Sequence, residues 1–160
     1  KNKKVMIMGS GGAGKAVIAY FTKELNNLNL YLTSRNKSYF NSEEKPKNIA
    51  WVDWQEKSLI LKTIDILINC TSLGFDSQID ITPIEDRDIR LLKKQSIVYD
   101  IIYNPEKTLL LNLAEKNELK IMNGSEMNLL QAVLAFKYVV NTVDKNIDPE
   151  KAMREIVKNK

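Results

Sequence analysis

Hydrophobic residues alternate between two spacings along almost the whole chain. Short unbroken apolar runs such as Val5–Met8 are typical of strands that are buried on both faces of a sheet. Stretches such as Ala13–Leu25, with apolar residues three or four positions apart, are typical of helices that cover a sheet. The runs predict six strands: Val5–Met8, Asn29–Thr33, Ile49–Val52, Asp65–Cys70, Ser96–Ile102 and Leu119–Asn123.

Helical and loop patterns fill the intervals between these runs. Asp148 followed by Pro149 is a strong helix start, with the aspartate as N-cap and the proline at the first helical position. Polar loops are expected at 34–48, where one helical turn has room to form, at 71–78 and at 103–108. The helical patterns cover Ala13–Leu25, Gln55–Lys62, Glu85–Lys94, Leu109–Asn117, Ser125–Val143 and the segment from Pro149 to the end.

Strands that alternate with helices form parallel sheets, because each helix carries the chain back to the same edge. We therefore predict the α/β class, with a Rossmann-type, doubly wound, mostly parallel six-stranded sheet of order 3-2-1-4-5-6. The length of 160 residues is typical of one domain with a real core, and we assign residues 1–160 to one domain. The chain lacks an initiator methionine and opens close to a buried strand, so we expect a domain cut from a longer protein.

The composition excludes several kinds of chemistry. The chain has no histidine, which removes the commonest general acid or base and the usual metal ligand. The single cysteine, Cys70, excludes an internal disulfide and a multi-cysteine zinc site, so no metal is expected. A reducing cytoplasm is the expected location. Cys70 follows a buried strand, and we expect it to be an inert small hydrophobe.

Charge and hydropathy add two further exclusions. The net charge is +4, from 24 basic and 20 acidic residues that are well mixed along the chain. Because no basic stripe is interleaved with aromatic residues, nucleic acid is not an expected partner. No apolar run is long enough to cross a bilayer, and no signal-peptide core follows the basic start at Lys1–Lys4, so no membrane association is expected.

The segment Gly9–Gly14 fits the pattern G-x-G-x-x-G between a predicted strand and a predicted helix. Each glycine has a steric reason: Gly9 permits the tight turn, Gly11 lets a pyrophosphate approach the backbone, and Gly14 lets the helix pack closely on the strand. Free N–H groups at the start of the helix would then face the anion. In this context the pattern predicts a dinucleotide-binding turn.

The end of the second predicted strand distinguishes NADP from NAD. A site for NAD places an aspartate or glutamate there, which accepts a hydrogen bond from the ribose 2′-hydroxyl. This chain has Ser34, Arg35, Asn36 and Lys37 instead. An arginine at this position can stack on adenine and bind a 2′-phosphate, while the serine and asparagine can donate further hydrogen bonds. NADP(H) is therefore the expected cofactor.

Four separated groups of residues resemble the cofactor-binding half of shikimate dehydrogenases. The family patterns are G-A-G-G-A, N-R-T, I-N-A-T-x-x-G, and the pair Y-D-x-x-Y-x-P-x-x-T-P-L-L and G-x-x-M-L-x-x-Q-A. The matching segments occur in the family's order and cover nearly the whole chain. They are GSGGAGKA (Gly9–Ala16), SRN (Ser34–Asn36), INCTSLG (Ile68–Gly74), YDIIYNPEKTLLL (Tyr99–Leu111) and NGSEMNLLQAVLAF (Asn123–Phe136).

The resemblance implies a role for each matching position. The glycine turn would cradle the pyrophosphate, the loop after the second strand would hold the 2′-phosphate, and residues further on would line the nicotinamide pocket. Tyr103 and Gln131 would reach the hydroxylated ring of the substrate. The implied cofactor residues are Gly9, Ser10, Gly11, Gly12, Ala13, Ser34, Arg35, Asn36, Lys37, Thr71, Ile101, Gly124 and Met127.

The residues themselves support only part of this assignment. A Rossmann ligand lies at the ends of the fourth and fifth strands, so Asn69, Thr71 and Tyr103 are candidates without any family. Taken alone, Gln131 is expected to face solvent and Met127 to pack in the core. The chain departs from the family pattern in four respects: Ser34 for asparagine, Tyr39 at the position of a second basic residue that Lys37 could replace, Leu109 for proline, and Glu126 and Asn128 at apolar positions.

The resemblance implies that the whole protein reduces 3-dehydroshikimate to shikimate with NADPH, in the pathway to chorismate and the aromatic amino acids. The family's catalytic lysine and aspartate lie in an N-terminal substrate domain, so no catalytic residue is named in this chain, and Lys15 is interpreted as a surface residue. The alternatives are a quinate/shikimate dehydrogenase that accepts NAD, a non-catalytic dinucleotide-binding or regulatory module, and the related domain of glutamyl-tRNA reductase. The missing carboxylate argues against the first, Tyr103 and Gln131 against the second, and the Q-A motif against the third.

Overall fold

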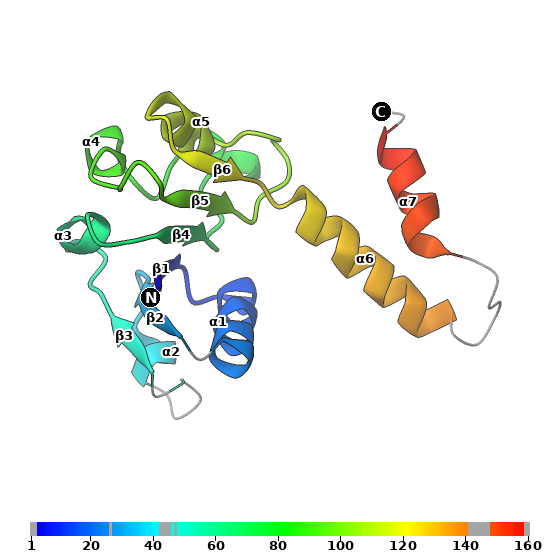
Figure 1. The fold of residues 1–160 in the computed structure, drawn as a ribbon, viewed down its shortest axis with the longest axis horizontal. Coiled ribbons are helices and arrows are strands. Elements are labelled where there is room, and N and C mark those ends of the chain that lie inside the picture. The colour runs from blue at the N-terminus through cyan, green and yellow to red at the C-terminus, as the bar shows by residue number, and fades with distance from the viewer. Residues whose placement is uncertain (1–2, 26, 42–45, 47, 141–147, 159–160) are drawn as a thin grey trace.

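The computed structural model describes residues 3–25, 27–41, 46, 48–140 and 148–158. They form a six-stranded sheet in which every pair of neighbouring strands is parallel (Figure 1). The strand order β3-β2-β1-β4-β5-β6 confirms the predicted Rossmann-type topology. The strands are β1 (Lys3–Met8), β2 (Leu28–Thr33), β3 (Ile49–Trp51), β4 (Ile66–Asn69), β5 (Ile97–Asp100) and β6 (Lys120–Met122).

Helices connect the strands and continue beyond the last one. The loop after β2 contains one helical turn, as the sequence allowed, and a short 3-10 helix lies in the loop after β4. Within the described ranges, no helix combines the length and apolar character needed to cross a membrane. The helices are α1 (Gly12–Glu24), α2 (Ser38–Asn41), α3 (Ser58–Leu61), η1 (Asp76–Gln78), α4 (Asp86–Ile89), α5 (Leu109–Lys116), α6 (Ser125–Val140) and α7 (Pro149–Lys158).

The carboxyl ends of the central strands lie side by side. Met8, the last residue of β1, pairs with Thr33 at the end of β2 and with Asn69 at the end of β4. Asn69 in turn pairs with Asp100, the last residue of β5. The segments that follow these four residues therefore leave the sheet at one edge. The chain order reverses between β1 and β4, where a doubly wound sheet forms its ligand crevice.

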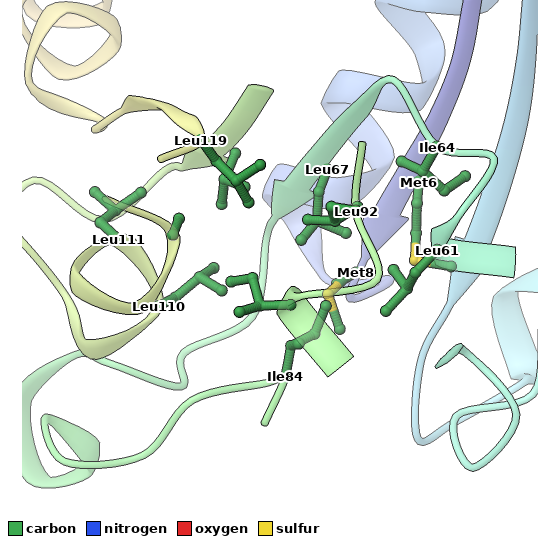
Figure 2. Packing of buried hydrophobic residues seen from close by; sticks show 13 residues of the cluster. Met6, Met8, Leu61, Ile64, Leu67, Ile84, Leu92, Leu110, Leu111 and Leu119 are labelled. Atoms are coloured by element: carbon green, nitrogen blue, oxygen red, sulfur yellow. The ribbon is translucent and has the colours of Figure 1, made fainter. Parts of the chain in front are cut away.

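Alternate residues of the central strand supply two separate cores. Met6 and Met8 of β1 pack in the cluster covered by α3, α4 and α5, which Figure 2 shows from close by. Val5 and Ile7 point to the other face and pack with Ile18 of α1. All five side chains are fully buried. The strand buried on both faces, which the unbroken apolar run predicted, is therefore confirmed.

Two predicted helices are shorter than their apolar patterns indicated. The structure has α3 at Ser58–Leu61 within the predicted 55–62, and α4 at Asp86–Ile89 within the predicted 85–94. Around both, backbone N–H groups bond to the carbonyl three residues earlier, as in Leu59 to Glu56 at 3.0 Å. The chain around α3 is therefore wound more tightly than an α-helix, whereas α4 also has α-type bonds, such as that from the N–H of Ile89 to the carbonyl of Glu85 at 3.0 Å.

The C-terminal helices form a separate arm of the molecule. Figure 1 shows α6 leading away from the sheet after β6, with α7 beside it. The predicted cap is confirmed, because Asp148 accepts hydrogen bonds from the backbone N–H groups of Glu150 and Lys151 at 3.1 and 3.3 Å. Arg154 of α7 binds Glu126 at the start of α6. Residues 141–143 of the predicted helix lie outside the described residues.

Leu61→Ala should lower the free energy of unfolding by about 2–5 kcal/mol, because it removes a fully buried side chain from the larger core. Leu59→Ala is the matched control: the same short helix carries Leu59, which is 74% exposed, and an exposed substitution is expected to stay within about 0.5 kcal/mol. Urea denaturation of both variants measures the difference. Equal losses of unfolding free energy in the two variants would contradict the described position of α3.

Candidate functional site at the carboxyl ends of the strands

The turn after β1 is held by backbone contacts that only glycine permits. Gly9 has φ +99°, and its N–H donates to the carbonyl of Thr33 at 2.8 Å. A Cβ at Gly9 would lie 2.8 Å from the carbonyl oxygen of Cys70, the residue just after β4. A Cβ at Gly14 would lie 2.1 Å from the carbonyl oxygen of Gly9. The steric roles predicted for Gly9 and Gly14 are therefore confirmed.

The other two glycines face open space. No heavy atom lies within 4 Å of a Cβ built on Gly11 or Gly12, and Ala13 is exposed beside them. Gly11 is the N-cap of α1, and no side chain caps this helix end. The first-turn N–H groups of α1 are thus accessible to an anion. This geometry fits a pyrophosphate at Gly11, whose binding role stays a prediction.

Hydrogen bonds join the glycine turn to the loop after β2. The hydroxyl of Ser10 donates to Ser34 Oγ at 3.0 Å and, at 3.4 Å, to the carbonyl oxygen of Asn36. The side-chain oxygen of Asn36 accepts from the N–H of Ser38 at 2.8 Å, which shapes the start of α2. Two segments far apart in the sequence therefore form one continuous surface. These three residues of the predicted cofactor set lie together.

The two basic residues of this loop differ in their surroundings. Arg35 is exposed and makes no hydrogen bond or ion pair with any residue that the structure describes. The Lys37 ammonium lies over the ring of Trp51 on β3, 5.4 Å from its centre, and over Phe40 at 5.8 Å. A surface cavity of about 250 Å³ adjoins both Arg35 and Lys37. Its lining is Ser34, Arg35, Lys37, Trp51, Asp53, Trp54 and Gln55.

Sequence reasoning missed the contribution of the neighbouring elements to this cavity. Asp53 follows β3, which lies beside β2, so a carboxylate reaches the cavity from the end of a strand to which the sequence patterns assigned no part in the site. Its Oδ1 accepts from the N–H of Gln55 at 3.0 Å. The exposed Lys15 of α1 places its ammonium 4.9 Å from the centre of the Tyr39 ring. Such contacts depend on strand order and loop path, which local patterns do not carry.

A buried polar network ties the ends of β4 and β5 together. Asp100 is fully buried, and its carboxylate accepts from Asn69 Nδ2 at 3.1 Å, from the N–H of Ile102 at 3.1 Å and from the Thr108 hydroxyl at 2.7 Å. Burial raises the pKa of the Asp100 carboxyl above its ordinary value, and these three hydrogen bonds oppose the rise. The network continues to Thr71, whose N–H and hydroxyl donate to Asn69 Oδ1 at 3.0 and 2.7 Å.

Cys70 lies between these groups and takes no part in the network. Burial, with the charge of Asp100 nearby, raises the pKa of the Cys70 thiol to about 12. The thiol is therefore protonated at neutral pH and unreactive, which agrees with its interpretation as a small hydrophobe. No group of three or more possible metal ligands is found among the described residues.

The residues predicted for the nicotinamide side are partly brought together. The N–H of Gly124 donates to the carbonyl of Ile102 at 3.0 Å, and a Cβ at Gly124 would lie 1.8 Å from the carbonyl oxygen of Ile101. Met127 is half-buried one turn further on in α6. Tyr103 and Gln131 are both exposed and form no hydrogen bond with each other. Ile101 and Gly124 thus form one wall, while the two substrate candidates stand free of it.

A parallel sheet of this order, with a glycine turn after its first strand, defines the Rossmann class of dinucleotide-binding domains. No protein-family model matches the chain. It is 36% identical over 137 residues to a shikimate dehydrogenase (NADP+) of Clostridium botulinum, a match that covers 84% of this chain and 50% of the relative. The chain is homologous to the shikimate dehydrogenases, and it spans about half the length of the curated relatives it matches.

Solved structures agree with this relationship. Shikimate dehydrogenase from Aquifex aeolicus is 28% identical, with a TM-score of 0.75 over 98% of this chain and 54% of its own. A second shikimate dehydrogenase, in complex with NADP+, is also 28% identical, with a TM-score of 0.73 over 99% of this chain and 55% of its own. The described fold, α6 and α7 included, is therefore a fold that larger dehydrogenases contain.

Gly14→Ala should destabilise the fold by about 1–3 kcal/mol, because the new methyl group would press on the carbonyl of Gly9. Gly12→Ala is the control in the same helix. It meets no atom within 4 Å, and the better helix propensity of alanine should leave it neutral or more stable by up to about 1 kcal/mol. Thermal denaturation compares the variants, and a stable Gly14→Ala protein would contradict the close packing of α1 on β1.

Proposed function

We propose that this chain is the NADP(H)-binding domain of a shikimate dehydrogenase. One observation carries the proposal. The open glycine turn is hydrogen-bonded through Ser10 and Ser34 to a β2 end that presents Arg35 and no carboxylate. Arg35 offers a guanidinium to a 2′-phosphate, and the carboxylate that lines the same cavity, Asp53, comes from the end of β3 and already accepts from the N–H of Gln55. The relatives are named for NADP+, and one solved neighbour holds NADP+, which supports the same cofactor here.

The part of this chain in the reaction is to bind and orient. When bound, NADPH supplies the hydride that reduces 3-dehydroshikimate to shikimate. Gly11 and Gly12 leave room for the pyrophosphate at the first turn of α1, and Arg35 faces the 2′-phosphate. At the other end Ile101 and Gly124 form the wall beside the nicotinamide. Tyr103 and Gln131, which are exposed and stand apart from this wall, are the polar groups that we assign to the substrate.

The proton for the reduced carbonyl comes from outside these residues. A general acid must lie within about 2.6–3.2 Å of the carbonyl oxygen, and the chain has no histidine to serve as one. We assign the acid and base to an N-terminal substrate domain, which is the half of the relatives that this chain does not match. The proposed reaction needs neither a metal nor nucleic acid. The single buried cysteine, which forms no disulfide, supports the cytoplasmic location that we propose.

The exposed surface of α6 supports the proposal that a substrate domain packs on this helix. Apolar residues occur all round this helix, a pattern typical of buried helices. Leu134, Tyr138 and Val139 are nevertheless 67, 88 and 70% exposed. Large exposed apolar patches mark interaction surfaces, and Gln131, a substrate candidate, lies on the same helix. We infer that the substrate domain packs on α6 and closes the cleft from that side.

Arg35→Ala should weaken binding of NADPH by about 1–3 kcal/mol, the loss expected for a charge-assisted hydrogen bond, and leave binding of NADH nearly unchanged. The control is Arg87→Ala, which removes an exposed arginine on α4 and should alter neither affinity. Isothermal titration of both cofactors measures the difference. Equal losses for NADPH and NADH would contradict the assignment of Arg35 to the 2′-phosphate.

The 160-residue chain should bind NADPH but should not oxidise shikimate measurably, because it lacks a positioned acid and base and a closed cleft. Loss of positioning alone costs several kcal/mol of barrier, out of about 7–11 kcal/mol that proximity can supply. The assay follows reduction of NADP+ with shikimate, first for this chain and then with an upstream substrate domain attached. Clear turnover by the chain alone would show that the catalytic groups lie within these residues.

A further inference from the structure

The Asp100 carboxylate has no role in the proposed function and yet is costly to bury. It is fully buried, no basic side chain of the described residues pairs with it, and desolvation dominates its environment. An isolated buried charge is retained only when hydrogen bonds replace the lost water. Three donors do so here, and each comes from a different segment: β4, the chain just after β5, and the start of α5.

The first donor, Asn69, connects Asp100 to the loop after β4 through further hydrogen bonds. Asn69 binds Asp100 through Nδ2, which also donates to the carbonyl of Leu73 at 3.3 Å. Its Oδ1 holds both the N–H and the hydroxyl of Thr71. The Thr71 hydroxyl in turn accepts from the N–H of Leu73 at 3.2 Å. The path of residues 71–73 is therefore set by Asn69, which is itself oriented by Asp100.

The other two donors fix the opposite wall. The N–H of Ile102 is held directly, and this residue lies between Ile101 and Tyr103. Thr108 donates to Asp100 while its oxygen accepts from the N–H of Leu111, so the same hydroxyl caps α5. A Cβ at Gly74, with φ +103°, would lie 3.3 Å from Thr108. The loop after β4 is thereby packed against the start of α5.

We propose that Asp100 is a positioning residue, which sets the two walls of the nicotinamide end of the site through Asn69, Ile102 and Thr108. The inference rests on the proposed function, because that function places the nicotinamide beside Ile101 and Gly124; we add the loop that carries Thr71 as the opposite wall. Asp100 itself touches neither cofactor nor substrate. Its action is confined to the β4 and β5 side, since no described contact joins it to Ser34, Arg35 or Asn36 at the adenosine end.

The test compares a ligand that fills both ends with one that fills only the adenosine end. Asp100→Asn keeps the shape of the side chain but replaces one carboxylate oxygen by an amide NH₂ group. With the amide in place of Oδ2 the Thr108 hydroxyl loses its acceptor, and with the amide in place of Oδ1 both Asn69 and Ile102 lose theirs. Affinity for NADPH should fall by roughly fivefold to tenfold, the range for one such bond. Affinity for adenosine 2′,5′-bisphosphate, which has the 2′-phosphate but no nicotinamide, should not change.

Three further variants, one at Asp65 and two at Thr108, separate positioning from loss of stability. Asp65→Asn removes a partly buried carboxylate at the other edge of the sheet, where it accepts from Lys4 and Lys93 at 2.9 Å, and should leave both affinities unchanged. Thr108→Val should repeat the selective loss for NADPH, and Thr108→Ser should restore the affinity. These two also decide the matter if Asp100→Asn does not fold.

The outcomes are distinct. Equal losses for NADPH and the bisphosphate, or unchanged NADPH affinity in folded Asp100→Asn and Thr108→Val proteins, would overturn the positioning role. If the unaltered chain bound neither ligand, the proposed function would fail, and the role of Asp100 would fail with it. If Arg35→Ala weakens the bisphosphate while Asp100→Asn does not, the two ends of the site are independent, as the structure indicates.

Discussion

The contact of two glycines with carbonyl oxygens fixes the centre of this molecule. Gly14 lets α1 lie directly on the carbonyl of Gly9, and Gly9 lies directly on the carbonyl of Cys70. With the hydrogen bond from Gly9 to Thr33, these contacts set α1, β2 and β4 relative to β1. Because no side chain lies between these glycines and the carbonyl groups, backbone geometry alone sets the direction of the first turn of α1. The place where an anion would meet its N–H groups therefore depends on packing that a single methyl group would disturb.

The two ends of the site differ in the interactions that form them. At the β2 end, exposed side chains on a loop provide charge, and Arg35 keeps its hydrogen-bonding capacity for a ligand. At the β4 and β5 ends, a fully buried network provides shape, and its carboxylate is saturated by internal donors. Exposed charges act over short range and are weakened by salt, whereas a buried, hydrogen-bonded group rigidifies what it touches. Under the proposed function, affinity and alignment are thus supplied by separate parts of one sheet edge.

Much of the fold could be predicted because its signals are local. Apolar runs marked all six strands, and the glycine turn with alternating helices indicated their order. The ends of elements were less accurate: β4 and β5 stop at Asn69 and Asp100, two strand ends whose side chains turn into the network. The one-turn helices α3 and α4 were predicted too long, since an apolar pattern does not distinguish tight turns from an α-helix.

The parts of the site that the sequence did not reveal are those whose partners are distant in the chain. Nothing local connects Asp100 to Asn69, 31 positions earlier, or Lys37 to Trp51 on the adjacent strand. Such pairs result from the strand order, so they can be identified only once the fold is known.

Helix α6 has apolar residues on all sides, although the sheet does not cover them. A helix that is apolar all round has more surface to bury than one neighbour can cover, and α7 is the neighbour it has among the described residues. The sheet and its helices thus have a core of their own, while under the proposed function the helix that carries Gln131 is left for a second domain to cover. Under the proposed function, the residue that meets substrate lies where the two halves meet, so closing the cleft and burying α6 would be one event.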